Sequence, residues 1–332
     1  MISAPSATAI SSGQPKAATL LARSAGSDKI AHAYLFRGPD GVGKREAAIA
    51  FAARLNCDFL ENGAACGRCP SCRKLFAGNH PDFIHIEPDG AAIKISQIRE
   101  LKKALTFPPL EARHRVALLA DVHTMRREAA NSMLKTLEEP PADTILILTG
   151  DEAGGILPTI LSRCQVIPFF ALPYEHVAAT LVREEEIDGE EAAALAAAAE
   201  GSLGRARMLH KSGLLAQRRL IVEALLRYPA AAPEAVEPLL NLAEESGGLK
   251  ETLPELLDLL RLWFRDLIVT AIGGPAGLIS SRDLQPLLAA ALQRWSLPEL
   301  IDRFDLLAEA EKQLSRNCNR ALVCEVLFFA LL

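Results

Sequence analysis

The chain has 332 residues, half of them hydrophobic, so about two or three domains with sizeable cores are expected. The formal net charge of −5 argues against a protein that coats nucleic acid by charge alone, although a local basic face is compatible with it. The sequence contains no stretch of about 18 uncharged apolar residues, so it predicts no membrane span. The segment Met1 to Gln14 lacks the basic n-region and the apolar h-region of a secretory signal. We therefore expect a cytoplasmic protein with no membrane partner.

The first half of the chain alternates short apolar runs with helical patterns. This alternation predicts a parallel sheet whose strands are joined by crossover helices. The run at 144–149 is apolar almost throughout, as is typical of a strand buried on both faces. The expected strands are 33–36, 83–87, 116–120, 144–149 and 165–169, and the expected helices are 45–55, 96–105 and 127–137.

After Pro173 no strand-like run remains, and only helices are expected. Two short helices are predicted at 177–182 and 190–200, and another begins near Gly201. Long helices follow from about Gly213. The predicted domains are an α/β domain over 1–170, a small helical domain over 171–212 and an all-helical C-terminal domain over 213–332.

A glycine-rich loop runs from Gly38 to Lys44, between the first expected strand and a helix. This context is typical of a phosphate-binding loop, in which backbone N–H groups converge and the helix N-terminus adds positive potential. Lys44 would reach the β and γ phosphates of ATP, and ADP is the other nucleotide that the loop could hold. The candidate nucleotide-binding residues in this loop are Gly38, Gly41, Gly43 and Lys44.

Two positions lack the residues that ATP hydrolysis requires. Residue 45 is Arg, where a phosphate loop needs Ser or Thr to ligate Mg²⁺. The expected strand at 116–120 ends in Ala120 and Asp121, where an active site carries two acids, one for Mg²⁺ and one to orient water. Because both changes affect the metal, the sequence predicts lost hydrolysis and leaves nucleotide binding open.

Four cysteines lie close together in the sequence, at Cys57, Cys66, Cys69 and Cys72. Their spacing suits a closed, tetrahedral Zn²⁺ site of structural type, which leaves no open position for catalysis. An iron–sulfur cluster is an alternative, although the spacing differs from the common ferredoxin run. A redox pair or four unliganded cysteines are further alternatives.

Two further motifs are Asn-Ser-Met-Leu-Lys-Thr-Leu-Glu-Glu-Pro-Pro at 131–141 and Ser-Arg-Cys at 162–164. With the phosphate loop and the cysteine insertion, they resemble the clamp-loader subunits of bacterial DNA polymerase III, which are AAA+ proteins. The resemblance is strong over about 13–206 and only architectural beyond. It implies an AAA+ P-loop domain, a helical lid and an all-α collar. It also implies a hetero-pentameric ring with gamma/tau and delta subunits that loads a sliding clamp on primed DNA.

Two classes of subunit in this family share these motifs. The gamma/tau motor has an intact Gly-Lys-Ser/Thr and Asp-Glu-x-His, whereas the delta-prime class keeps the cysteine module and has a degenerate ATP site. Arg45 and Ala120 match the second class, which implies a chain without catalysis of its own inside the DNA-directed DNA polymerase III holoenzyme. The glycine loop from Gly38 to Lys44 departs from this match, because it is better preserved than an inactive ATP site requires. The alternatives are an active gamma/tau-like motor and a zinc-knuckle nucleic-acid module, which would need interleaved basic and aromatic residues.

The resemblance also implies roles for three residues. Arg163 corresponds to an arginine finger that acts in trans on ATP held by a neighbouring subunit. Thr149 corresponds to a sensor at the end of its strand, and Arg205 corresponds to a second sensor. From the residues alone, a helix-capping or ion-pairing role is favoured for Arg163, and only the resemblance reverses this order. For Arg205, the residues alone favour a solvated arginine on a helix.

Overall fold

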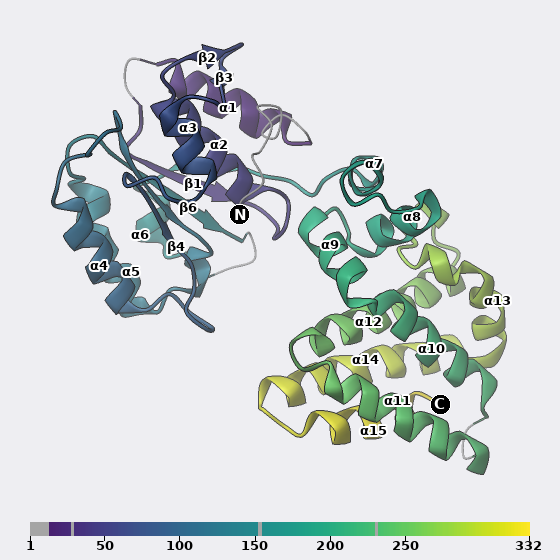
Figure 1. Ribbon diagram of the computed structural model, residues 1–332. Helices are drawn as coiled ribbons and strands as arrows, with labels where there is room; N and C mark the ends of the chain where they lie inside the picture. The colour runs from purple at the N-terminus through teal and green to yellow at the C-terminus, as the bar shows by residue number, and fades with distance from the viewer. Residues whose placement is uncertain (1–12, 28–29, 152–154, 230–231) are drawn as a thin grey trace. The chain divides into compact units, whose positions relative to one another are not determined.

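The computed structural model describes residues 13–27, 30–151, 155–229 and 232–332. The chain forms two compact units, the first ending at Leu172 and the second beginning at Pro173 (Figure 1). The predicted division of the second unit at residue 213 stays a prediction. The N-terminal stretch in which no secretory signal is expected lies, up to residue 12, outside the described residues.

The first unit contains a five-stranded sheet with the order β4-β5-β6-β1-β7, in which every pairing is parallel. The predicted parallel sheet is therefore confirmed, and each of its strands lies where the apolar runs place it. The strands are β1 Ala33–Arg37, β4 Phe83–Ile86, β5 Arg115–Leu119, β6 Thr144–Gly150 and β7 Gln165–Pro168.

Helices cover both faces of this sheet, because successive side chains of a strand point to opposite sides. Tyr34 and Phe36 of β1 are buried in the core that the sheet forms with one set of helices, whereas Ala33 and Leu35 are buried in the core on the other face. The first set comprises α1 Pro15–Ala25, α2 Lys44–Asn56 and α3 Pro70–Phe76, and the second comprises α4 Ile95–Leu105, α5 Arg127–Glu138 and α6 Pro158–Leu161 (Figure 1).

A buried acidic residue, Asp82, fixes the connection between α4 and β5. Its carboxylate accepts the backbone N–H groups of Leu110, Glu111 and Ala112 at 2.8–2.9 Å and pairs with the guanidinium of Arg115 at 2.9 Å. Burial alone would raise the pKa of Asp82, but these donors outweigh it and lower the pKa to about 2. The network gives the loop a fixed course, and the sequence analysis did not predict it.

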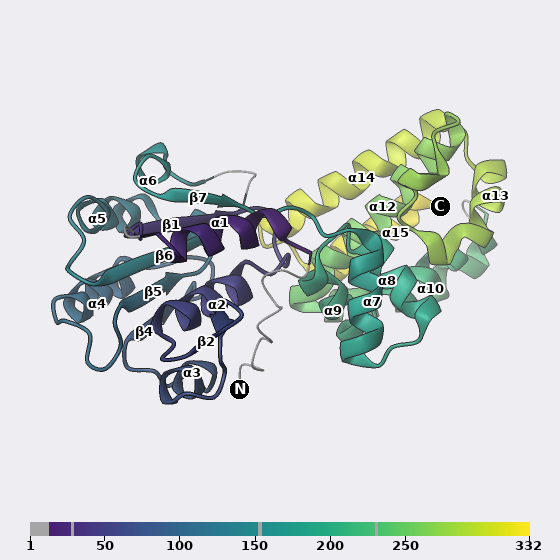
Figure 2. The same ribbon diagram turned by 90° about the horizontal axis from the view of Figure 1, so that it is seen from above.

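The described elements of the second unit are all helical (Figure 2). Within it, α11 packs along α15 and α12 packs along α14, and Trp263 of α12 is completely buried. No helix among the described residues is both long and apolar enough to cross a membrane. The helices are α7 Tyr174–Glu185, α8 Gly189–Ala198, α9 Leu203–Ser212, α10 Leu214–Arg227, α11 Val236–Gly248, α12 Leu253–Ala271, α13 Gln285–Arg294, α14 Leu297–Ser315 and α15 Arg320–Leu331.

Candidate functional site

The glycine loop joins the end of β1 to the start of α2 and borders a cavity of about 390 Å³. Gly41 and Gly43 have φ values of 68° and 96°, a left-handed region that favours glycine, and Gly43 is the residue before the first turn of α2. Lys44 and Thr149, predicted from separate parts of the sequence, line the same cavity. The structure thus brings these four candidate residues together.

Gly38 is required for a different reason. A Cβ atom at this position would lie 2.2 Å from the carbonyl oxygen of Phe169, which follows β7. The loop is fixed to the same segment by Gln14, whose side-chain Nε2 donates to the carbonyls of Phe170 at 2.6 Å and Val42 at 3.3 Å. Val42 is itself buried in the core. Packing therefore holds the course of the loop.

Lys44 is turned toward its own loop. Its Nζ donates to the carbonyl oxygens of Gly38 at 2.8 Å and Pro39 at 2.6 Å, and the side chain is almost fully buried. Burial lowers the pKa of Lys44, while Asp40 and other nearby carboxylates oppose that shift. To reach a phosphate, the ammonium group would have to exchange these carbonyls for phosphate oxygens.

The positions expected to serve Mg²⁺ carry other chemistry. Arg45 forms an ion pair with Glu87, which follows β4, and one of its Nη atoms lies 3.4 Å from His85 Nδ1. Asp121 adopts a left-handed conformation with φ 52°, and its backbone N–H donates to the hydroxyl of Thr149 at 3.0 Å. A guanidinium thus stands at the cavity in place of the Ser or Thr hydroxyl that ligates Mg²⁺.

The four clustered cysteines converge in space. Their Sγ atoms all lie within 4.8 Å of one another, a spread that a tetrahedral metal with four thiolates can close. Backbone N–H groups point at the sulfurs: that of Cys66 donates to Cys57 Sγ, that of Cys69 to Cys66 Sγ and that of Cys72 to Cys69 Sγ, at 3.3–3.4 Å. The cluster can therefore hold a metal ion.

Local structure explains how these cysteines meet. Cys57 follows the end of α2, and a hairpin of β2 Leu60–Glu61 and β3 Ala64–Ala65 then leads to Cys66. Cys69 is the residue before α3, where its sulfur accepts the N–H of Cys72. The turns between them use Gly63 and Gly67, whose φ values of 75° and 70° lie in the left-handed region that favours glycine.

A buried histidine attaches this module to the sheet. His80 Nδ1 accepts the backbone N–H of Asp82 at 3.1 Å, so its proton lies on Nε2, which is 3.2 Å from Ser71 Oγ of α3. Burial lowers the pKa of His80 and favours the neutral ring that this arrangement needs. The sequence analysis missed this contact because the two partners of His80 belong to different elements.

Arg163 lies just after α6 and is held by three neighbours. Its Nε donates to Glu138 Oε1 at 2.9 Å, and Nη2 contacts the same oxygen. Nη1 donates to the carbonyl oxygen of Thr159 at 3.0 Å and to Ser162 Oγ at 3.1 Å. Cys164 packs against the core beneath. In this chain Arg163 is thus an ion-paired arginine. Its role in trans stays a prediction.

Arg205, the predicted second sensor, lies in the second unit. It is mostly buried at the start of α9, and three carboxylates surround it: Glu200 at 3.8 Å, Glu255 at 3.2 Å and Asp258 in close contact. The alternative of a simply solvated arginine is therefore wrong. Its role toward nucleotide stays a prediction.

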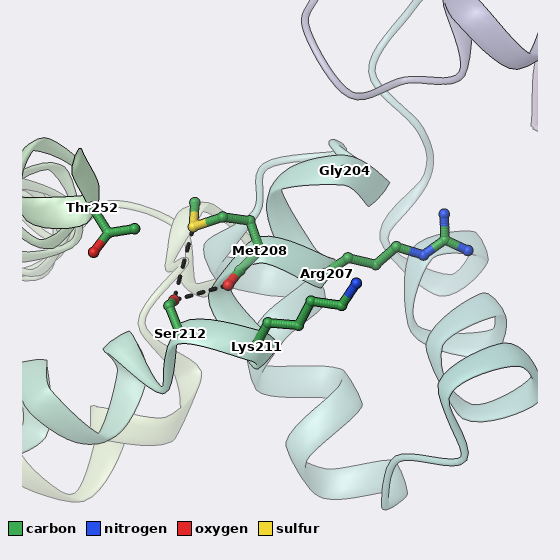
Figure 3. A pocket seen from close by; sticks show the side chains of 6 residues that line it. All are labelled: Gly204, Arg207, Met208, Lys211, Ser212 and Thr252. Carbon is green, nitrogen blue, oxygen red and sulfur yellow. Dashed lines mark hydrogen bonds between the residues drawn. The ribbon is translucent and has the colours of Figure 1, made fainter. Parts of the chain in front are cut away.

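The other face of α9 borders a shallow hollow of about 430 Å³ (Figure 3). Ser212 Oγ donates to the carbonyl oxygen of Met208 at 2.8 Å (Figure 3). The hydroxyl of Thr252 donates to the carbonyl oxygen of Leu249. Arg207 pairs with carboxylates of α7. Ser212, Thr252 and Arg207 are thus satisfied within the protein, and the remaining charged lining residue, Lys211, is exposed on the surface of α9, so the hollow lacks the set of converging polar groups that marks a ligand site.

Taken together, the parallel sheet, the phosphate loop after β1, the acid after β5 and the Ser-Arg-Cys segment after α6 define a P-loop protein of the AAA+ class. The model of the family described as DNA polymerase III, delta subunit matches residues 13–173. The chain belongs to the DNA polymerase III delta-prime subunit family, as its full-length relatives establish.

Two delta-prime subunits match nearly the whole chain. That of Bacillus subtilis is 32% identical, over 92% of this chain and 92% of that protein. That of Pseudomonas aeruginosa is 33% identical, over 91% of this chain and 92% of that protein. The tau subunit of Escherichia coli is 37% identical, but only over 58% of this chain and 30% of that protein. The gamma/tau alternative is therefore the less supported one.

Proposed function

We propose that the chain is a non-hydrolysing member of a DNA polymerase III clamp loader. It assembles with gamma/tau and delta subunits in a pentameric ring and helps to load the sliding clamp on primed DNA. The observation that carries this proposal is the ion pair of Arg45 with Glu87, in a chain whose full-length relatives are delta-prime subunits.

The charges at the cavity support the absence of hydrolysis. Arg45 and Lys44 are both engaged by protein groups, and Asp121 is the single acid after β5 because position 120 is Ala. Burial raises the pKa of Asp121, with Asp40 adding to the effect and the charges of His123 and Lys44 opposing it. Nucleotide can still contact the loop backbone, but Mg²⁺ lacks its usual ligands.

Arg163 supplies the catalytic contribution of this subunit in trans. We assign it to the γ-phosphate of ATP held by a neighbouring motor subunit, where a planar guanidinium stabilises the charge of the transition state. Its partial exposure, at 32% for the side chain, leaves it reachable from outside the chain. Thr149 and Arg205 are assigned to the family's two sensor positions as remnants of a nucleotide site.

The experiment that tests the function uses the intact chain alone and in the assembly. Alone, it is expected to show no Mg²⁺-dependent ATP turnover, because the metal ligands are missing. Added to gamma/tau and delta subunits with clamp and primed DNA, it is expected to restore clamp loading that is absent without it. Steady turnover by the isolated chain that disappears in Lys44→Ala would instead favour the motor alternative.

We also propose that Cys57, Cys66, Cys69 and Cys72 hold one structural Zn²⁺. Protein purified under reducing conditions without chelator should contain about one equivalent of zinc, and Cys69→Ser should lose the metal and lower the melting temperature of the first unit. Cys318→Ser, at an exposed cysteine of the second unit, is the matched control and should retain the zinc. A zinc content below about half an equivalent in the unaltered protein would count against the site.

A further inference from the structure

Glu138 and Arg163 are 25 residues apart, yet their side chains meet. A guanidinium has five N–H donors, of which four are used here: two on Glu138, one on Thr159 and one on Ser162. All three nitrogens take part. The remaining donor is on Nη2, which also contacts Glu138. The group is therefore fixed along two of its edges, with one N–H left for an incoming acceptor.

Two observations indicate that this contact orients Arg163 and contributes little to stability. The side chains of Arg163 and Glu138 are 32% and 48% exposed, and exposed ion pairs stabilise a fold weakly. Glu138 is also the last residue of α5, where the negative end of the helix dipole disfavours a carboxylate. The carboxylate of Glu138 thus slightly destabilises the C-terminal end of α5, and Arg163 is the cation with which this carboxylate pairs.

We propose that Glu138 is the positioning residue for Arg163. It holds the guanidinium in one orientation at the surface of the first unit. The N–H donors of Arg163 are then already oriented when the γ-phosphate of ATP on a neighbouring subunit approaches. The proposal rests on the proposed function of Arg163 in trans. A long arginine side chain without this contact samples many rotamers, and the lost pre-orientation lowers the rate of the reaction it assists.

The test uses reconstituted assemblies with gamma/tau and delta subunits, clamp and primed DNA. In each, kcat and KM of the stimulated ATPase are measured for Glu138→Ala, Glu138→Gln, Arg163→Ala and the double variant Glu138→Ala/Arg163→Ala. Glu138→Ala is expected to lower kcat several-fold at unchanged KM. Glu138→Gln keeps an oxygen that accepts from Nε and is expected to recover part of the rate. The double variant is expected to be no slower than Arg163→Ala.

Glu139→Gln is the matched control, since Glu139 is the adjacent exposed carboxylate and no ion pair of its side chain occurs among the described residues. It should leave kcat unchanged. A normal or faster Glu138→Ala assembly beside a slow Arg163→Ala assembly would overturn the role of Glu138 and leave the finger intact. A normal Arg163→Ala assembly would overturn the finger itself. If Glu138→Ala assembles poorly, Glu138→Met replaces it in the test, because Met keeps the length of the side chain without an oxygen acceptor. A normal kcat of the Glu138→Met assembly contradicts the proposal.

Discussion

Replacing Arg163 with Ala is expected to slow the DNA- and clamp-stimulated ATPase of the reconstituted loader, and clamp loading with it. A finger supplied in trans is worth about 10³–10⁵ in rate at the site that it serves. The overall loss is expected to be smaller than this, because in the proposed ring Arg163 serves one ATP site and the other interfaces are unchanged by the substitution. Arg163→Lys should not restore the rate fully, since a point ammonium cannot reproduce the planar fork that Glu138 and Thr159 hold here.

The measurement must separate chemistry from assembly. Arg163→Ala should retain the fold and the ring, because the side chain is partly exposed and its ion pair with Glu138 is worth about 1 kcal/mol or less. Melting curves, zinc analysis and gel filtration of the assembly check this. Clamp loading at the normal rate by a fully assembled Arg163→Ala complex would leave Arg163 with only the local role that it has in the isolated chain.

Asp82→Asn should have the largest effect on stability. The amide keeps the shape of the side chain but removes the charge, so Arg115 remains buried beside a neutral partner, and some of the N–H donors of the 110–112 loop lose their acceptor. Breaking a buried pair by removing one partner typically lowers the free energy of unfolding by about 3–5 kcal/mol. Chemical denaturation of the first unit, followed by its circular dichroism, measures this loss.

The same carboxylate predicts how stability depends on pH. The folded pKa of Asp82 is about 2 and the unfolded value is 3.8, so its contribution is complete above pH 3.8 and is lost as the pH falls toward 2. The difference corresponds to about 2 kcal/mol. The unaltered protein should lose this much over that window, whereas Asp82→Asn should lack this component of the pH dependence.

Asp89→Asn is the control for this comparison, because Asp89 is an exposed carboxylate that pairs with Lys94 at the surface. It should change the free energy of unfolding by less than about 1 kcal/mol. An Asp82→Asn protein as stable as this control would show that the 110–112 loop does not depend on the buried charge.

Local sequence patterns predicted the frame of the first unit well. Strands such as β6 are buried on both faces and therefore read as continuous apolar runs, and the glycine loop and the cysteine cluster are contiguous motifs. The helices α1 and α3 were missed. Each begins with Pro at the first turn, and α3 lies within the cysteine insertion, where the metal pattern dominated the interpretation.

Contacts between distant residues could not be read in the same way. Asp82 and Arg115 are 33 residues apart, and Arg205 and Asp258 are 53 apart. No periodicity links such pairs, because their meeting depends on the order of the strands and the packing of the helices. An isolated charge beside a buried strand, as at Asp82 before β4 and Arg115 at the start of β5, is the one signal that could have indicated a buried partner.

The packing of Gly38 against Phe169 has a consequence for how this loop changes under mutation. Any side chain at position 38 would collide with the backbone carbonyl of Phe169, and the side chain of Val42 is buried in the core of the first unit. These requirements persist when no nucleotide is bound. If the subunit does not hydrolyse ATP, as we propose, positions 45 and 120 are released from the chemistry of Mg²⁺, whereas Gly38 is still required by its packing against Phe169. Part of the phosphate-loop pattern, the glycine at position 38, is therefore explained by packing within the first unit, without reference to a bound nucleotide.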